Sequence, residues 1–468
     1  MGTTSRSHKP NEWAAKVNHT QIINDPFIKQ FIKECEFPKE ASEIEIEDEA
    51  IFHSLEENIH NPIKHILAVD GGYTTVEVKK NFPSSQIAFF QFGAVLFSID
   101  DLNSLSEKPF ISPEDMNKLH SLRRFKLAIP IKNVISGKQT SLTNSIRKAI
   151  YDFFMREHDS SCFMETLCWL IFEEYTHSQA SSYDLGSNPY PDSEINKIKL
   201  KRSEMKSDYT FDTEVGEIFL TDIFRLHEAI DEEFGAGGIL GYITRLIEQL
   251  ILVHFIRKIR VLRPSLLNEF LFISDGPLSF SGQTANMHKP LRKLCNYLLE
   301  KENLFLVGLE KSGAFVDHAQ EICLPRKGKS ILQKGSYILL DNKYIYKYVI
   351  PGDPNAAPYA RTSYYGGKVI FHSSDAQIFV LTVPVPHEKV VMNPQEKDYK
   401  NLKEIMINIQ KLRCDMYDDS IIPVALVNKL VSLANHPSKV LLEKFATNTI
   451  LNSERRMGAP DKGRMGRR

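Results

Sequence analysis

Several apolar runs along the chain have the pattern of buried β-strands. Residues 65–69 read HILAV and lead directly to Asp70 and two glycines, and residues 86–99 read QIAFFQFGAVLFSI. Runs that are apolar throughout, without alternation, are typical of strands covered on both faces. A later run, residues 269–274, reads EFLFIS and is followed by Asp275 and a glycine. These runs predict strands of a central sheet, two of which end at an aspartate.

Helical patterns lie between and after these strands. Residues 141–159 and 162–175 are helix-like, and a further helix is expected over residues 287–301. The stretch 236–264 is largely apolar and carries Arg and Lys in its last turns before a closing proline, which predicts a mostly buried helix. Strand-like runs separated by Gly and Pro over residues 336–383 predict peripheral β-hairpins. The whole pattern predicts an α/β fold.

Changes of composition divide the chain into four parts. Residues 1–60 form a predicted amino-terminal helical extension, and residues 61–100 together with 236–450 form the main α/β domain. Residues 101–235 have a helical character and a polar, Ser/Asn/Pro-rich loop, and we interpret them as a helical insertion. The last stretch, residues 451–468, is a basic tail.

Charge is balanced over the 468 residues. There are 58 Lys and Arg against 59 Asp and Glu, for a net charge of −1. Such a chain has no overall attraction to nucleic acid, so any contact with DNA must use local basic patches. Candidate patches are the basic end of the helix at 236–264 and the sequence KIKLKR at 197–202.

Cysteine usage and the amino terminus indicate the compartment. The six cysteines are scattered without a CxxC pair, which disfavours a disulfide framework or a cysteine-rich zinc site and favours a reducing environment. The first residues, MGTTSRSHKPNEW, contain no apolar run and therefore no signal peptide. No uncharged apolar segment reaches the roughly 18 residues of a membrane span. We expect a cytoplasmic protein without a membrane segment.

The two aspartates that follow apolar strands are candidate metal ligands. Polar chemistry in α/β sheets gathers where strands leave the core. If the strands before Asp70 and Asp275 are neighbours, about 4.8 Å apart, their carboxylates converge and repel each other. A divalent cation such as Mg²⁺ or Mn²⁺ relieves that repulsion. The alternative is that each Asp-Gly pair only forms a turn.

A glutamate and a lysine complete the candidate site. Glu248 has mostly Leu, Ile, Val and Phe neighbours in RLIEQLILVHF. A buried carboxylate is costly unless it is paired or bound to a metal, and the alternative to a metal is a local pair with Arg245. Lys311 follows the apolar strand of NLFLVGLEKSG, where a lysine can hold a scissile phosphate or stabilise the negative charge of a transition state. The alternative for Lys311 is an ordinary exposed lysine.

The same glycines admit a competing interpretation. DGGYT fits the Asp-x-Gly-x-Thr phosphate loop of actin-like and Hsp70-like ATP-binding proteins through Asp70, Gly72 and Thr74. The second phosphate hairpin and the adenosine loop of that fold have only poor counterparts here. No GxxxxGK[ST] loop is present in the sequence. A third interpretation is a catalytically inactive adapter that docks a motor protein.

The order of these pieces resembles the NurA nucleases. In that family a ribonuclease H-like fold carries a strand ending in Asp-Gly, a helix with a glutamate, a second strand ending in DG-P/S-L, and a strand followed by a lysine. The matching pieces lie within residues 65–100 and 236–445. They are LAVDGG with Asp70, RLIEQL with Glu248, FISDGPL with Asp275 and LVGLEKSG with Lys311.

The resemblance implies both a fold and an activity. The fold is a ribonuclease H-like mixed sheet flanked by helices. The activity is Mn²⁺- or Mg²⁺-dependent hydrolysis of DNA at ends and single strands, by a homodimer that works with a hexameric HerA-type ATPase in DNA-end processing or anti-phage defence. Asp70, Glu248 and Asp275 would bind metal, with Asp70 bridging two ions, and Lys311 would contact the phosphate.

The chain departs from the family pattern in two places. The stretch 101–235 is longer than compact members need. The carboxyl-terminal element of the family, a Tyr-Pro followed by a helix with a histidine, corresponds here to SIIPVALVNKLVSLANH, in which Ile422 replaces the tyrosine and Leu430 lies near the expected histidine. We expect the accessory role to pass to one of three residues: Asn428, Tyr417 or His436.

Overall fold

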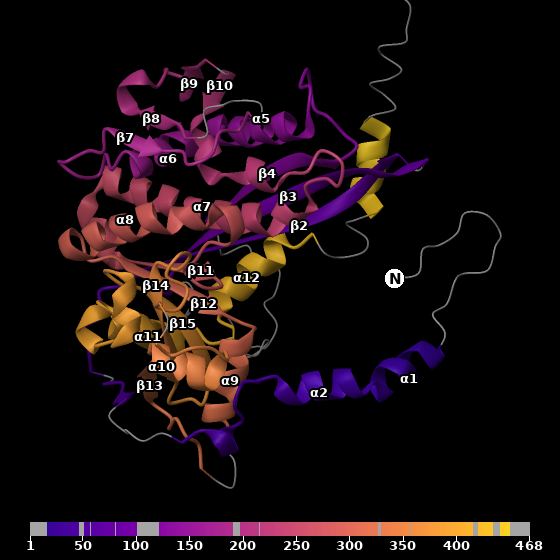
Figure 1. Cartoon of the computed structure of the whole chain (residues 1–468). Helices are drawn as coiled ribbons and strands as arrows, with labels where there is room; N and C mark the ends of the chain where they lie inside the picture. Colours follow the sequence, from indigo (N-terminus) through magenta and orange to yellow (C-terminus); the bar gives the residue numbers. More distant parts are fainter. Residues whose placement is uncertain are drawn as a thin grey trace, which may run out of the picture.

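The central feature of the molecule is one large mixed β-sheet (Figure 1). The computed structural model describes residues 16–45, 51–56, 58–79, 81–100, 121–190, 197–214, 216–325, 329–355, 357–414, 420–433 and 440–449. Within them, nine strands form the sheet. In sheet order these are β1 (Phe52–Ser54), β13 (Ser336–Leu339), β14 (Gly366–His372), β15 (Ile378–Pro384), β12 (Phe305–Glu310), β11 (Phe270–Asp275), β2 (His65–Lys79), β3 (Phe82–Ser98) and β4 (Ser121–Lys132).

The sheet combines a parallel centre with antiparallel strands on both sides. Strands β2, β11 and β12 are parallel to one another, and β3 and β4 continue the sheet beyond β2 in antiparallel fashion. On the other side, β15, β14, β13 and β1 are all antiparallel to their neighbours. The predicted mixed α/β sheet flanked by helices is therefore confirmed.

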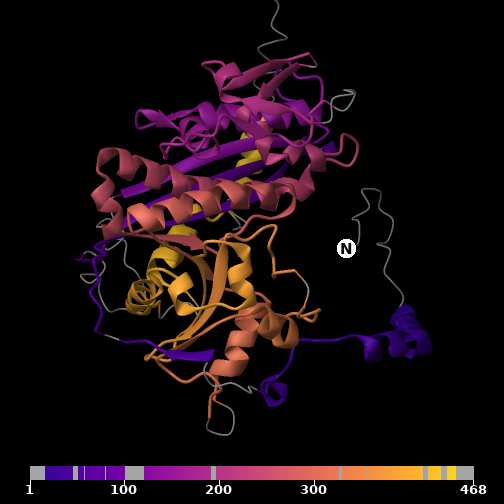
Figure 2. The ribbon, with the colours of Figure 1, turned by 60° about the vertical axis from the view of Figure 1, so that its left-hand side comes forward.

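Helices cover both faces of the sheet (Figures 1 and 2). The pleat directs Leu67 and Val69 of β2 to one face and Ile66 and Ala68 to the other, as successive side chains of a strand must point. The first face is packed by α5 (Leu142–Met155), α6 (Phe163–Ile171), α7 (Leu240–Leu262), α8 (His288–Lys301), α9 (Ala314–Cys323) and α10 (Asn342–Tyr344). The second is packed by α11 (Leu402–Lys411) and α12 (Ile422–Val431).

The amino-terminal helices stand apart from this body. Helices α1 (Lys16–Asn24) and α2 (Pro26–Glu34) project away from the sheet in both ribbon views, and α2 contains no buried residue. Pro26 occupies the first turn of α2, and the Asp25 side chain caps it by accepting from the N–H groups of Phe27 and Ile28.

The predicted division of the chain needs three corrections. Strand β4 comes from the predicted helical insertion at 101–235 but pairs with β3 over most of its length. Strand β1 comes from the predicted extension at 1–60 but pairs with β13. The predicted peripheral hairpins at 336–383 supply β13, β14 and β15 to the central sheet. Strands β1 and β15 find backbone partners that are distant along the chain, in β13 and β12 respectively.

The rest of the stretch 121–235 forms a layer over α5 and α6. Besides helices, it contains three two-stranded sheets in the described residues. Their strands are β5 (Glu157–His158), β6 (Ser161–Cys162), β7 (Ser182–Asp184), β8 (Lys199–Lys201), β9 (Thr210–Thr213) and β10 (Gly216–Phe219). The basic tail predicted at 451–468 lies outside the described residues.

Helix α7 is the core helix of the fold. Although it contains charged residues, the segment Gly237–Leu262 is long and apolar enough to cross a membrane by length and composition. However, 72% of its most apolar window is buried inside the protein, where α7 packs on β2 and α6. Its hydrophobicity is therefore accounted for by packing against the sheet.

Candidate metal centre

Asp70 and Asp275 leave neighbouring strands side by side. Val69 of β2 is in register with Ser274 of the parallel strand β11, so the two aspartates that follow occupy the same level of the sheet. Strand β11 ends at Asp275, whereas β2 continues to Lys79 because β3 keeps pairing with it. The expectation that Asp70 ends its strand is wrong, but its parallel neighbour does end there, and this opens the sheet beside the two carboxylates.

Glu248 approaches this level of the sheet from helix α7. A Cβ on Gly71 would lie 3.1 Å from Glu248 Oε1 and 2.5 Å from the Phe92 ring, so a side chain at position 71 would displace the carboxylate or the ring. Because adjacent residues of a strand point to opposite faces, Asp70 faces the α12 side while Glu248 lies on the α7 side. Glu248 is only 6% exposed.

Burial and neighbouring charge both make Asp70 hard to ionise. Burial raises the pKa of Asp70 to about 6, and the Asp275 carboxylate contributes to the rise. The Gly71 N–H, which donates to Asp70 Oδ1 at 2.8 Å, the Lys311 ammonium and the Asn428 amide lower the pKa. Asp70 Oδ2 is buried and has no hydrogen-bond partner. This carboxylate oxygen is therefore a hydrogen-bond acceptor that receives no donor from the described residues.

The Glu248 carboxyl shows the same effect more strongly. Burial raises the pKa of Glu248 to about 8, and both Asp70 and Asp275 add to the rise. Only Arg245 opposes it, through its charge and a hydrogen bond from Nη1 to Glu248 Oε2 at 3.3 Å. Three carboxyl groups far apart in the chain therefore act on one another electrostatically in the folded protein.

Arg245 is a site residue whose role the sequence analysis underestimated. Its Nη1 donates to Glu248, to Ser274 Oγ at 3.2 Å and to the main-chain oxygen of Asp275. Ser274 Oγ is in turn held by Gln249 Nε2 at 2.7 Å. Arg245 Nη2 is buried without a hydrogen-bond partner. The guanidinium thus joins helix α7 to the end of β11. The spacing of Arg245 and Glu248 indicated a local pair as the alternative to a metal, but no sequence pattern indicated the contact with Asp275.

Lys311 is paired with a carboxylate of the site. Its Nζ lies 2.8 Å from Asp275 Oδ2, and its side chain is 26% exposed. The preceding residue, Glu310, points to the opposite face of the sheet and forms a buried ion pair with Lys368 of β14. Thr382 Oγ1 also donates to Glu310 Oε1, at 3.2 Å. Lys311 is therefore a cation of the candidate site, held by Asp275.

The loop after β11 depends on a glycine in the next strand. Gly276, at φ +85°, lies against the Arg245 guanidinium and begins the turn DGPL. A Cβ on Gly308 of β12 would lie 2.5 Å from Gly276 O and 2.8 Å from Leu278 N. Only glycine at 308 lets this loop pass so close to β12, so the glycine of LVGLEK helps to place Asp275.

The described residues do not contain a ready-made metal cluster. No three His, Cys, Asp or Glu side chains in those ranges are placed to hold one ion together. The charges of Glu248 and Asp275 are met by Arg245 and Lys311. The unpartnered oxygen of Asp70 and the mutual repulsion of the three carboxyls nevertheless fit a divalent cation, which would satisfy that oxygen and reduce the repulsion.

Of the three candidates for the accessory role, the structure places one near the site. Asn428 of α12 is close enough to Asp70 to lower the pKa of that carboxyl. Tyr417 and His436 lie outside the described residues. Ile422 and Leu430, which stand where the family has its tyrosine and near its histidine, are partly buried and pack against the core.

The competing phosphate loop is absent from this part of the chain. Residues 70–74 are extended and paired with β3 from Gly93 back to Phe89. Their backbone groups belong to a sheet ladder and form no turn around a phosphate. The predicted ATP-binding interpretation therefore loses its main structural element.

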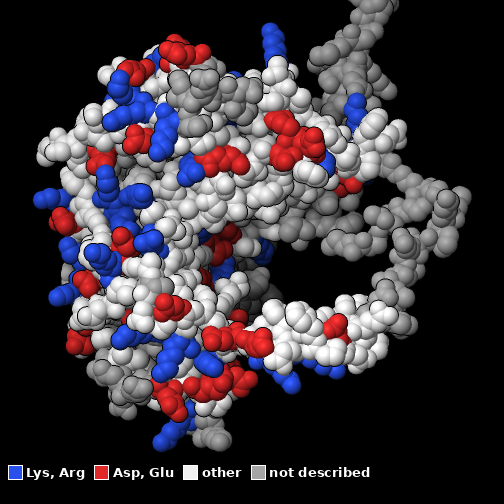
Figure 3. Space-filling view, viewed as in Figure 1, with Lys and Arg blue, Asp and Glu red and all other residues white. Residues whose placement is uncertain are grey.

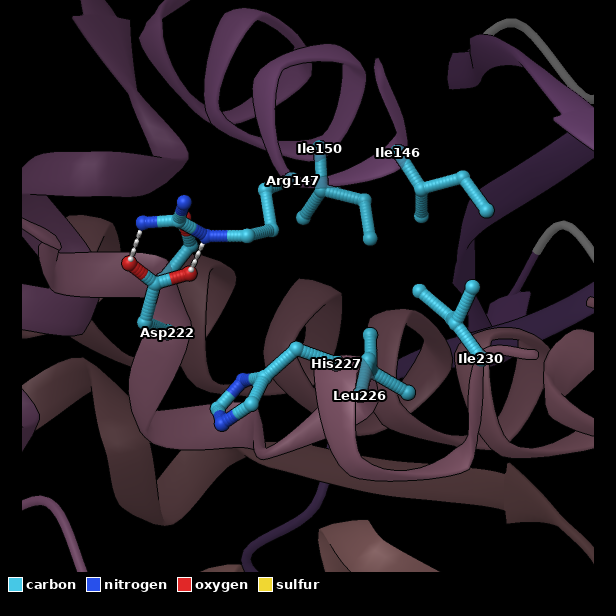
Figure 4. A pocket seen from close by; sticks show the side chains of 8 residues that line it. Ile146, Arg147, Ile150, Asp222, Leu226, His227 and Ile230 are labelled. Atoms are coloured by element: carbon cyan, nitrogen blue, oxygen red, sulfur yellow. Dashed lines mark hydrogen bonds and ion pairs between the residues drawn. The ribbon is translucent and has the colours of Figure 1, made fainter. Parts of the chain in front are cut away.

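The enclosed space beneath α5 is not a substrate site. It has a volume of about 10 Å³, which leaves room for one water at most. Figure 4 shows Arg147 and Asp222 at its wall, joined by two hydrogen bonds of 2.8 and 2.7 Å, with His227 below them. This buried ion pair fastens α5 to the segment around Asp222.

Comparison with known proteins identifies the family. The model of the NurA domain matches residues 64–356. The chain is similar to the crystal structure of the NurA nuclease from Sulfolobus solfataricus, with 8% identity, a TM-score of 0.33 and coverage of 96% of this chain and 99% of that chain. It is also similar to a crystal structure of NurA with manganese, with 12% identity, a TM-score of 0.28 and coverage of 94% and 97%. No curated protein matches the chain. Because the NurA domain matches more than half of the 468 residues, the chain belongs to the NurA family of nucleases.

Proposed function

We propose that this protein is a metal-dependent deoxyribonuclease that hydrolyses phosphodiester bonds at DNA ends and in single strands. The observation that carries the proposal is the side-by-side placement of Asp70 and Asp275, with Glu248 close enough for both to raise its pKa. Such repulsion costs stability and is kept where it serves a function, which makes the cluster a candidate active site.

Asp70, Glu248 and Asp275 would hold Mn²⁺ or Mg²⁺. Asp70 would contribute its unpartnered Oδ2, and Glu248 and Asp275 would contribute oxygens that Arg245 and Lys311 now hold. When bound, the metal supplies a water of lowered pKa and stabilises charge on the phosphate.

The chain's own residues would orient the substrate. The Lys311 ammonium, 2.8 Å from Asp275 Oδ2 and partly exposed, would bind a phosphate oxygen of the scissile group. Arg245 would keep helix α7 and the end of β11 in register by its contacts with Glu248 and Asp275. Asn428 of α12 would orient Asp70 on the face of the sheet that α12 covers, opposite to α7.

The wider predictions from the family resemblance belong to the same proposal. The meander β2–β3–β4, continued beyond β2 by the parallel strands β11 and β12, supports a ribonuclease H-like core. We also propose a homodimer in the cytoplasm that works with a HerA-type hexameric ATPase in DNA-end processing or anti-phage defence. None of the six cysteines, all of which lie in the described residues, forms a disulfide, which supports a reducing compartment.

The test incubates end-labelled linear and single-stranded DNA with Mn²⁺ or Mg²⁺ and the full chain, with and without the motor ATPase. We expect cleavage by the wild type and none by Asp70→Asn, with Asp184→Asn, an exposed aspartate on β7, as a matched control. Cleavage by Asp70→Asn at the wild-type rate would contradict the proposal. Stable binding of the motor without cleavage in any mixture would identify an adapter. ATP binding by this chain alone, measured by calorimetry, would identify the ATP-binding alternative.

A further inference from the structure

A row of exposed cations lies on the sheet face that carries Asp70. Asp70 of β2 is in register with Gly93 of β3, and Gly93 is in register with Arg124 of β4. The next row on this face joins Gly72, Gln91 and Lys126 in the same way. Because adjacent strands are about 4.8 Å apart, the Asp70 and Arg124 backbones are separated by roughly 10 Å.

Helix α12 packs on this face over β2 and β3 (Figure 1). On one flank, Asn428 acts on Asp70. On the other flank, Leu430 accepts a hydrogen bond through its main-chain oxygen from Gln91 Nε2 at 3.1 Å. Lys429 lies between these two residues in sequence, and since each residue turns a helix by about 100°, its exposed side chain points away from the sheet, over the top of α12.

We propose that Lys429, Arg124 and Lys126, hereafter the basic track, bind the sugar-phosphate backbone of a DNA strand and lead it over α12 to Asp70. The inference rests on the proposed nuclease function and adds to it the path of the substrate. All three side chains are exposed, and none forms an ion pair within the described ranges. These cations have no acidic partner in those ranges and lie beside the candidate phosphodiesterase site. Their charge is therefore complementary to the phosphates of a DNA strand.

On the opposite face of β4, and elsewhere on the surface, other cations are already paired with acidic side chains. Arg123, next to Arg124, is in register with Ala94 on the α7 side and pairs with Asp159 at 2.9 Å. Lys148 of α5 and Lys206 also pair with acids, namely Asp152 and Asp212. Cations that already have acidic partners contribute less to a field that attracts phosphate. The face seen in Figure 3 likewise carries interspersed positive and negative side chains.

An edge strand can also carry Lys and Arg only to prevent pairing with another sheet, and β4 is the last strand in the sheet order. The two explanations predict different behaviour. Edge protection predicts that loss of these cations causes self-association and leaves DNA binding unchanged. A backbone track predicts weaker DNA binding with a smaller dependence on salt.

The experiment measures binding of a fluorescent single-stranded oligonucleotide by anisotropy, in EDTA and over a range of KCl concentrations. For Arg124→Gln/Lys126→Gln/Lys429→Gln we expect roughly tenfold weaker binding at low salt. We also expect the slope of log K against log salt to fall in magnitude by about 2, at about 0.7 per lost phosphate contact on a single strand. The conservative triple variant Arg124→Lys/Lys126→Arg/Lys429→Arg should bind as the wild type does, because backbone contacts need charge and not a particular base-reading geometry.

The matched control removes the same charge from the paired cations, in Arg123→Gln/Lys148→Gln/Lys206→Gln. An equal loss of affinity in the control would overturn the track in favour of net charge alone. Unchanged affinity and slope in the track variant, with or without aggregation, would also overturn it. Because divalent cations are absent from this assay, its outcome does not depend on cleavage. A protein that binds through the track but never cuts DNA would contradict the proposed nuclease activity and not the track.

Discussion

Arg245 and Glu248 form an ion pair one turn apart on α7, with Nη1 3.3 Å from Oε2. The same guanidinium nitrogen also donates to the main-chain oxygen of Asp275 at the end of β11. A pair that would be purely local on an isolated helix therefore ties the helix to the strand that supplies the second aspartate.

Removing the charge of Glu248 should stabilise the protein while it abolishes cleavage. The carboxyl is buried beside two other carboxyls, and only Arg245 compensates it. Glu248→Gln keeps a hydrogen-bond acceptor for Arg245 and removes the ionisable group whose raised pKa costs stability at neutral pH. We expect the free energy of unfolding in EDTA to rise by about 1–2 kcal/mol. Urea denaturation at neutral pH measures it, with Glu300→Gln on α8 as the control. A less stable Glu248→Gln protein would show that the ion pair outweighs the repulsion.

Divalent cations should stabilise the wild type and not the aspartate variants. A ligand that binds only the folded state at about 100 times its dissociation constant adds about 2.7 kcal/mol. We expect Mn²⁺ to raise the melting temperature, EDTA to reverse the rise, and Asp70→Asn or Asp275→Asn to abolish it. Asp184→Asn should respond as the wild type does. An equal response of all four proteins would place the metal elsewhere.

Alanine at position 308 should disrupt the loop that carries Asp275. Its Cβ would meet backbone atoms of Gly276 and Leu278 at 2.5 and 2.8 Å, and these atoms cannot move without shifting the loop. We expect a loss of about 2–3 kcal/mol of stability and of most activity. Gly241→Ala on α7 is the control, since nothing lies within 4 Å of a Cβ there, and it should be neutral or stabilising by up to about 1 kcal/mol.

Acid should destabilise the protein in part through His254. This side chain is 3% exposed and its Nδ1 lies 2.8 Å from Thr166 Oγ1. Burial, with nearby Lys258 and Arg257, lowers the pKa of His254 to about 3 from the ordinary 6.5. Between these values the unfolded chain binds the proton and the folded chain does not, so stability from this group is present above pH 6.5 and falls as the pH drops towards 3.

The expected size of this effect is up to about 1.4 kcal/mol per pH unit. Urea denaturation at pH 7 and at pH 5 should show a smaller drop for His254→Gln than for the wild type. The exposed His177→Gln should keep the full drop. An unchanged drop in His254→Gln would remove this histidine as a source of acid sensitivity.

Local sequence determined much of the fold and the composition of the site. Apolar runs predicted β2, β3, β11 and β12, and their lengths and turn residues agree with the structure to within a few residues except at Asp70, where β2 continues. Asp70, Glu248, Asp275 and Lys311 were each visible as polar groups at the ends of apolar segments or within them, because burying such groups is costly and so marks them.

Tertiary structure decided what those residues contact. The stretches around Phe52, Arg124 and Lys368 belong to the central sheet, which their local sequence did not indicate. A strand pairs through backbone groups, and its partner can be remote in sequence, so the pairing leaves little trace in a local pattern. The same is true of the Asp275–Arg245 contact, of the glycine at 308, and of which face of β4 carries the unpaired cations. The amino-acid sequence alone identifies the charged groups of this protein, whereas strand register and helix packing determine which of them meet.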